Sequence, residues 1–166
     1  MPNTEKHHGH PDAAEAPGPR FDSPVWRAGD ALVGLLARAG IGPIHLLTTR
    51  GRVTGQPHTK PVVPVVHDGR RWLVAPYGVV GWVRNARADG TVELRHGRTR
   101  RRYEVREATR DEAGPVLKRY LAVATKARVR VEVDHDAPVA DFVAVAGRYP
   151  VLELVPPAEP AEPHNR

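Results

Sequence analysis

Cysteine is absent from this chain of 166 residues, and serine occurs only once, as Ser23. The first absence excludes disulfides, thiolate catalysis and cysteine-based metal sites. The lone serine stands at the expected start of a helix without a Gly-x-Ser-x-Gly elbow, so serine hydrolysis is excluded as well. No His-Glu-x-x-His or similar spacing occurs, and the sequence therefore predicts no metal site.

Long apolar runs are also missing. No run of about 18 apolar residues exists, so no membrane-spanning helix is expected. The N-terminus lacks the apolar segment of a secretory signal. We therefore expect a cytoplasmic protein. Peripheral attachment to a membrane stays open, because the helix expected over 24–39 is amphipathic.

Negative charge is scarce in the middle of the chain. The whole sequence carries +6, but residues 1–22 carry −2 and residues 156–166 carry −1, which leaves +9 on residues 23–155. We expect the two ends to be a disordered arm and a flexible tail around one domain. Arginine supplies most of the positive charge, and its guanidinium pairs bidentately with phosphate or carboxylate. An anionic ligand, a nucleic acid or an acidic surface is the expected partner.

Periodicity and turn residues predict the order of helices and strands. Ser23 is a candidate helix cap, Thr109 begins a capping-box pattern, and Asp68-Gly69 is a hairpin signal. Pro61 and Pro64 require an edge or bulged strand. The expected strands are 44–49, 57–67, 71–76, 91–96, 100–107 and 151–155, and the expected helices are 24–39, 81–88, 110–124 and 138–147. Strands in runs with helices at the ends argue for an α+β fold with an antiparallel sheet or barrel.

The segment Thr48–Gly55 is the most informative stretch of the sequence. It reads Thr-Thr-Arg-Gly-Arg-Val-Thr-Gly and follows an apolar run. Backbone N–H groups, hydroxyls and guanidinium groups in such a turn suit a phosphate or carboxylate. The spacing matches neither a Walker loop nor a dinucleotide fingerprint, and a plain polar hairpin turn is the alternative.

Few side chains near this segment can act as acids, bases or nucleophiles. Asp68 is the only carboxylate between residues 43 and 88, so a carboxylate pair is implausible there. His45 lies in an apolar strand and is expected to be a core residue rather than a ligand. Either a bound organic cofactor supplies the reactive atom, or the site binds without catalysis.

Arginines over 95–106 give a rival signal. Strand alternation places Arg98, Arg100, Arg102 and Arg106 on one face, where they can follow phosphates of a nucleic acid. Only 5% of the chain is aromatic, and no base-stacking cluster appears, so a solvated hairpin face is the preferred interpretation.

Several segments together resemble a known family. They are Leu46–His58, the strand containing Pro61, Asp68-Gly69, Trp72–Gly78 and Gly81–Asn85. In this order they resemble the deazaflavin (coenzyme F-420)-dependent nitroreductase/quinone reductase family, mainly over residues 40–108. The resemblance implies a split β-barrel of the FMN-binding type, an antiparallel barrel with flanking helices, and leaves a homodimer open.

The resemblance also implies a coenzyme site for F-420, in preference to FMN or FAD, with an anionic phosphate and glutamate tail. Arg52, Thr54 and nearby N–H groups would hold the phosphate, and Lys60 or Arg84 would meet the tail. Trp82 and the Pro76-Tyr77 turn would wall the ring system. The residues expected at the coenzyme are Arg50, Arg52, Val53, Thr54, His58, Thr59, Lys60, Pro61, Val62, Val63, Ala75, Pro76, Tyr77, Gly78, Gly81, Trp82, Val83, Arg84 and Asn85.

Some of these positions depart from the family or have a second interpretation. Val53 stands where members usually carry Lys or Arg, and His58 where they carry Arg; Arg50 would compensate. Trp82 is alternatively a core residue, and Asn85 is alternatively a helix cap.

The resemblance implies an oxidoreductase that transfers a hydride from reduced F-420 to a small electrophile: a quinone, nitroaromatic or enone. Tyr77, Tyr120 or Tyr149 would donate or position the proton, with Tyr120 alternatively a core residue. Two other functions stay open. One is a non-catalytic barrel that binds a flavin-like, heme or lipid ligand, and the other is nucleic-acid binding through the Arg95–Arg106 hairpin.

Overall fold

A computed structural model describes residues 39–40 and 42–158 of the chain. The arm expected over 1–22 and the helix expected over 24–39, apart from Ala39, lie outside the described residues. Most of the tail expected over 156–166 lies outside them too, so these boundaries stay predictions.

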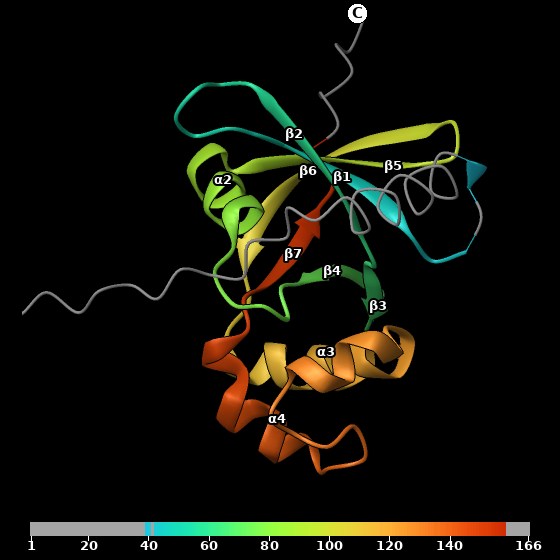
Figure 1. Ribbon diagram of the computed structural model, residues 1–166, viewed down its shortest axis with the longest axis vertical. Coiled ribbons are helices and arrows are strands. Elements are labelled where there is room, and N and C mark those ends of the chain that lie inside the picture. The colour runs from blue at the N-terminus through green and yellow to red at the C-terminus, as the bar shows by residue number, and fades with distance from the viewer. Residues whose placement is uncertain (1–38, 41, 159–166) are drawn as a thin grey trace, which may run out of the picture.

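Within the described part of the chain, seven strands form one antiparallel sheet in the order β2-β1-β5-β6-β7-β4-β3. Figure 1 shows that the sheet curls strongly rather than lying flat. The strands are β1 His45–Arg50, β2 Pro57–Val62, β3 Val65–His67, β4 Arg70–Val74, β5 Thr91–His96, β6 Thr99–Glu107 and β7 Val151–Val155. This confirms the predicted α+β class with a split, FMN-binding-like antiparallel barrel.

Helices flank the sheet on two sides. The short helix α2 lies beside β1 and β5, whereas α3 and α4 pack against each other at one end of the molecule (Figure 1). The helical segments are α2 Gly81–Asp89, α3 Arg110–Val123, η1 Thr125–Arg130, α4 Val139–Val145 and η2 Ala146–Arg148. Over residues 39–40 and 42–158, none of the helices has the length and apolar character that crossing a bilayer requires.

The core is divided between the two faces of the sheet. On β4, Trp72 and Val74 pack in the cluster beneath α3 and α4, as their alternation predicts. Leu73, between them, points to the inner face of the curled sheet and packs with Leu47 and Leu152. One strand therefore stabilises both the helical layer and the barrel interior.

The single strand expected over 57–67 is wrong, because Val63 and Pro64 lie outside any strand. Pro64 has no N–H group to donate to a neighbouring strand. The chain therefore leaves the sheet after β2 at one edge and rejoins it as β3 at the other edge. The edge position expected from the prolines is confirmed for both pieces.

The Asp68-Gly69 hairpin is confirmed between β3 and β4. Asp68 has φ of 50° and Gly69 has φ of 71°, the left-handed conformations that a tight two-residue hairpin requires. Asp and Gly tolerate these conformations better than other residues.

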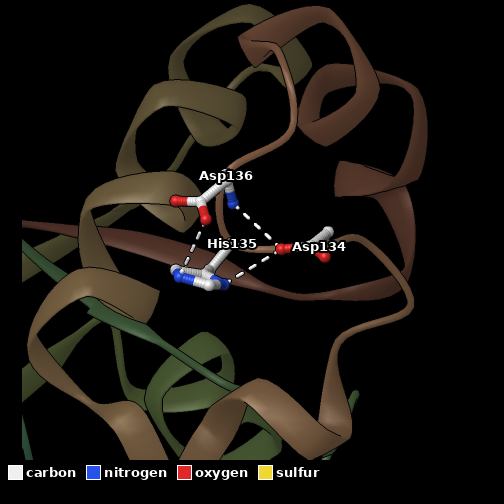
Figure 2. A group of neighbouring side chains, drawn as sticks. All are labelled: Asp134, His135 and Asp136. Atoms are coloured by element: carbon white, nitrogen blue, oxygen red, sulfur yellow. Dashed lines mark hydrogen bonds and ion pairs between the residues drawn. The ribbon is translucent and has the colours of Figure 1, made fainter.

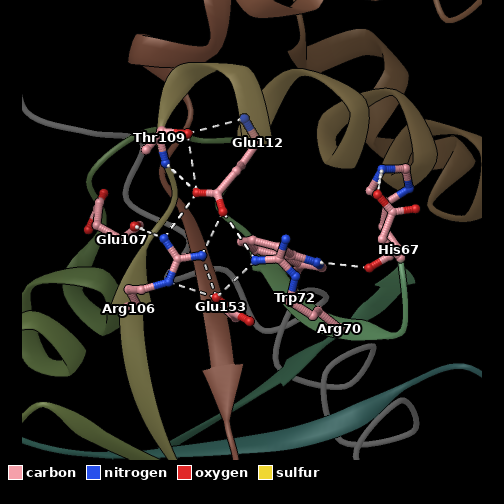
Figure 3. Close-up of polar contacts among 9 residues, drawn as sticks. His67, Arg70, Trp72, Arg106, Glu107, Thr109, Glu112 and Glu153 are labelled. Atoms are coloured by element: carbon pink, nitrogen blue, oxygen red, sulfur yellow. Dashed lines mark hydrogen bonds and ion pairs between the residues drawn. The ribbon is translucent and has the colours of Figure 1, made fainter.

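An ion-pair network fixes the start of α3 on the sheet (Figure 3). Arg106 of β6 donates to Glu112 of α3 at 2.8 and 3.0 Å and to Glu153 of β7 at 2.7 Å. The Thr109 hydroxyl accepts from the Glu112 N–H at 3.3 Å, and the Glu112 carboxylate accepts from the Thr109 N–H at 2.9 Å, which confirms the capping box. Arg106 and the Thr109 N–H hold the pKa of Glu112 far below its usual value.

The packing of α3 on α4 gives the first prediction. A Cβ at Gly114 would lie 2.3 Å from Val143 Cγ2 and 2.9 Å from the Val143 N atom. We expect Gly114→Ala to lower the free energy of unfolding by about 1–3 kcal/mol through overpacking. It should do so although alanine by itself favours a helix by about 1 kcal/mol.

Urea denaturation followed by circular dichroism measures this effect. Gly81→Ala in α2 is the matched control, because no atom lies within 4 Å of a Cβ at that position. Equal stability of Gly114→Ala and the wild type would show that α3 and α4 do not approach this closely.

Candidate functional site

The turn after β1 is closed by its own backbone. The Gly51 N–H donates to the Gln56 carbonyl at 2.8 Å, and the Gly55 N–H donates to the Gly51 carbonyl at 2.8 Å. Gly55 has φ of 70°. A Cβ at Gly51 would lie 2.8 Å from His58 Nε2 and 3.0 Å from the Gln56 oxygen. Both glycines are therefore needed for the chain to fold back tightly into β2.

Asn85 of α2 ties this turn to the helix. Its side-chain oxygen accepts from the backbone N–H and from the guanidinium of Arg52, both at 3.3 Å. Its amide nitrogen donates to the Thr49 hydroxyl at 3.4 Å, and both Asn85 and Thr49 are buried. Asn85 lies inside α2, whose N-cap is Val80, so the alternative interpretation of Asn85 as a helix cap is wrong.

A cavity of about 290 Å³ opens between the turn and the start of α2. Its lining residues come from the turn, from β2 and from the first turns of the helix: Gly51, Arg52, Val53, Thr54, His58, Lys60, Gly81, Trp82 and Asn85. Among the described residues, no Asp or Glu lines it, whereas Arg52 and Lys60 are cationic. The cavity suits an anionic ligand.

The structure thus brings together part of the predicted coenzyme site. Alternation along β2 places His58 and Lys60 on the cavity side, whereas the Thr59 hydroxyl is hydrogen-bonded to the Thr48 hydroxyl at 2.9 Å. Predicted residues that do not line the cavity are Arg50, Thr59, Pro61, Val62, Val63, Ala75, Pro76, Tyr77, Gly78, Val83 and Arg84. Their contact with a coenzyme stays a prediction.

Trp82 contacts both the cavity and the core. It lines the cavity and also packs against the inner-face cluster, the core cluster that contains Leu47, Leu73 and Leu152. The two interpretations of this side chain, ring wall and core residue, are therefore compatible.

Most N–H groups of the turn are used inside the protein. Those of Gly51 and Gly55 bond to carbonyls, that of Arg52 bonds to Asn85, and that of Gln56 bonds to the Thr54 hydroxyl at 3.3 Å. In the described part of the chain, the N–H groups of Val53 and Thr54 have no such partner. An anion at this turn would therefore meet only these two N–H groups together with side chains.

The three predicted proton donors lie outside the cavity lining. Tyr120 is a buried residue of α3 in the cluster that contains Trp72, and burial raises its pKa to about 12. Tyr149 is also buried, and its hydroxyl accepts from the Glu132 N–H at 3.1 Å. Tyr77 is 54% exposed, with the Arg130 guanidinium carbon 5.4 Å from its ring centroid. The interpretation of Tyr120 as a core residue is confirmed, and a proton-donor role stays a prediction.

The arginine face of the β5–β6 hairpin is partly neutralised. Arg106 binds Glu112 and Glu153, as described above, and Arg100 lies 3.7 Å from Glu93. Arg102 donates to the Thr91 hydroxyl at 3.0 Å. Binding of nucleic acid to this hairpin stays a prediction.

A group of possible metal ligands lies in the loop before α4, where no metal site is expected from the sequence. Figure 2 shows the imidazole of His135 between the carboxylates of Asp134 and Asp136, at 3.0 and 3.2 Å. Asp134 also accepts from the Asp136 N–H at 3.1 Å, which lowers the pKa of Asp134. Asp134 and Asp136 are exposed and their contacts are local, so we assign no metal to the group.

Known proteins resemble this chain in sequence or in fold. The model of the family described as F420H(2)-dependent quinone reductase matches residues 22–143. A protein of unknown function from Agrobacterium tumefaciens has a similar fold, with 16% identity, a TM-score of 0.52 and coverage of 75% of this chain and 53% of its own. A heme binding protein from Mycobacterium smegmatis is 13% identical, with a TM-score of 0.50 and coverage of 71% and 48%.

The chain thus spans about half the length of these two proteins, and at such identities the likeness shows the fold alone. A structure of an F420-H2 dependent reductase, FDR-A, is 21% identical, with coverage of 68% of this chain and 93% of its own and a TM-score of 0.48.

The role of Asn85 gives the second prediction. We expect Asn85→Ala to lower the free energy of unfolding by about 1–3 kcal/mol, because the Arg52 N–H and the Thr49 hydroxyl lose a buried partner. Asn85→Asp keeps an acceptor for Arg52 and should retain more of the stability. Urea denaturation at neutral pH measures both. If Asn85→Ala unfolds at the wild-type urea concentration, the amide does not hold the turn.

Proposed function

Because the chain belongs to the F420H(2)-dependent quinone reductase family, we propose that it binds reduced coenzyme F-420 in the turn cavity and reduces a small electrophile. The acceptor is a quinone, a nitroaromatic or an enone. The bound coenzyme supplies the hydride in this chemistry. The observation that carries the proposal is the cavity at the glycine-rich turn, which is lined by cations and by no carboxylate among the described residues.

The residues present fit the negatively charged part of the coenzyme. The Arg52 guanidinium, already oriented by Asn85, and the N–H groups of Val53 and Thr54 would hold the phosphate. Lys60 and His58 on β2 would meet the acidic tail. Val53 is 84% exposed, so the absence of a cation at that position removes one surface charge and leaves Arg52 in place.

The apolar residues of the cavity lining would orient the ring system of the coenzyme. Trp82 contributes an aromatic face that is fixed by its packing against the inner-face core. Gly81 opens the cavity next to it in the chain, since no atom lies within 4 Å of a Cβ there apart from its chain neighbours and its own helix backbone. A rigid wall beside open space favours binding of a planar group in one orientation.

The protein's own contribution to the reaction is orientation and charge stabilisation. No Asp or Glu of the described residues lines the cavity, so no carboxylate there can act as an acid or a base. Tyr77 is the one predicted proton donor that is exposed, and we keep it as the candidate for protonating the product. A cytoplasmic location and a homodimer are further parts of the proposal.

A second candidate function is binding of a flavin-like, heme or lipid ligand without turnover. A shared fold does not imply a shared activity. Two of the predicted proton donors, Tyr120 and Tyr149, are buried in the core rather than at the cavity, which favours this second candidate. With reduced F-420 in excess over the protein, we expect menadione to oxidise the coenzyme through many turnovers in stopped-flow absorbance. Binding without steady turnover would establish the passive carrier instead.

The proposed site predicts specific losses of binding. We expect Lys60→Gln and Arg52→Gln each to weaken F-420 binding by about 10–100-fold, the equivalent of one charge-assisted hydrogen bond of about 1.5–3 kcal/mol. The exposed side chain of Lys60 makes no hydrogen bond or ion pair within the described residues, so we expect its replacement to leave the fold intact.

Titration of the coenzyme's fluorescence measures these constants. Arg98→Gln is the matched control, because it removes an equal charge from an exposed position that does not line the cavity. Equal weakening by all three variants would contradict a specific site. Absence of wild-type binding at about tens of micromolar coenzyme would reject the proposal.

A further inference from the structure

We propose that the protein has a second binding site, for an organic anion that joins a phosphate or carboxylate to an apolar body. The site is a groove of about 520 Å³ where β4, β6 and β7 meet Pro156 and Pro157, which follow β7. Its lining residues are Gly69, Arg70, Arg71, Arg101, Arg102, Tyr103, Glu153, Leu154, Val155, Pro156 and Pro157. None of them lines the turn cavity, so the two sites are separate.

The one carboxylate of the groove lining, that of Glu153, is paired with the lining residue Arg70 and with Arg106. Glu153 is held by Arg106, and Arg70 lies 3.1 Å from Glu112 and 3.6 Å from Glu153. The carboxylate of Glu153 is thus compensated and does not repel an incoming anion strongly.

Three arginines of the groove have no carboxylate partner within the described residues. Arg71 is half-buried and donates to the Tyr103 hydroxyl at 3.0 Å, and Arg102 donates to the Thr91 hydroxyl. Arg101 is exposed beside them on β6. A guanidinium whose partner is a neutral hydroxyl has no carboxylate to balance its charge and has N–H donors left for an anion.

The remaining wall of the groove is apolar. Leu154, Val155, Pro156 and Pro157 form it together with the ring of Tyr103. Inorganic anions gain nothing from such a wall, whereas a ligand with an aromatic or aliphatic body buries apolar surface there. The volume falls within the range of small-molecule sites, about 300–1,000 Å³. The combination selects a small organic anion.

Isothermal titration of the full-length protein with 1-naphthyl phosphate tests the site. Inorganic phosphate lacks the apolar body and 1-naphthol lacks the charge, so both should bind at least tenfold more weakly. Arg101→Gln and Arg71→Gln should each weaken naphthyl phosphate binding at least tenfold, whereas Arg98→Gln on the same hairpin should change it less than twofold. The exposed side chain of Arg101 makes no hydrogen bond or ion pair within the described residues, which keeps the test independent of folding.

A parallel titration of Arg52→Gln separates this site from the turn cavity. Naphthyl phosphate binding that persists in Arg52→Gln and is lost in Arg101→Gln supports the groove. Binding that is lost in Arg52→Gln, or weakened equally by Arg98→Gln and Arg101→Gln, overturns it. No wild-type binding up to about 1 mM probe also overturns it, and leaves the F-420 titration unaffected.

Discussion

The hydrogen bonds of the Asn85 side chain connect α2 to the turn after β1, and the geometry of the site depends on them. One buried amide accepts from the backbone and the guanidinium of Arg52 and donates to Thr49. Without it, the turn would lose its hydrogen bonds to α2, and the Arg52 guanidinium would lose its orienting contact. A cation that is oriented before a ligand arrives loses less entropy on binding than one that is free to move.

The rest of the fold keeps these parts in place. Neighbouring residues of β4 point to opposite faces, so that Trp72 anchors the helical layer and Leu73 the barrel interior. Arg106 joins β6, β7 and the first turn of α3 through Glu153 and Glu112 (Figure 3). The sheet is thus supported on both faces, and the cavity forms where α2 meets the inner face.

Local signals in the sequence are sufficient for much of the fold, but not for the site. Asp68-Gly69 defines a hairpin and Thr109 a capping box because each involves residues only a few positions apart. The break at Pro64 cannot be predicted from the sequence, because residue spacing does not show that the two halves of 57–67 lie on opposite sheet edges. The role of Asn85 depends on a contact with Arg52, 33 positions away, which residue spacing cannot reveal.

The central claim is that the cationic cavity at the Gly51–Gly55 turn, and not the groove beside Arg71, receives the coenzyme. Backbone amide and indole NMR spectra, recorded as F-420 is added, test it most directly. The account predicts that the largest shifts occur at Arg52, Val53 and Thr54 and at the Trp82 indole, with little change at Arg101. Shifts confined to the groove, or spread evenly over the exposed arginines, would contradict it.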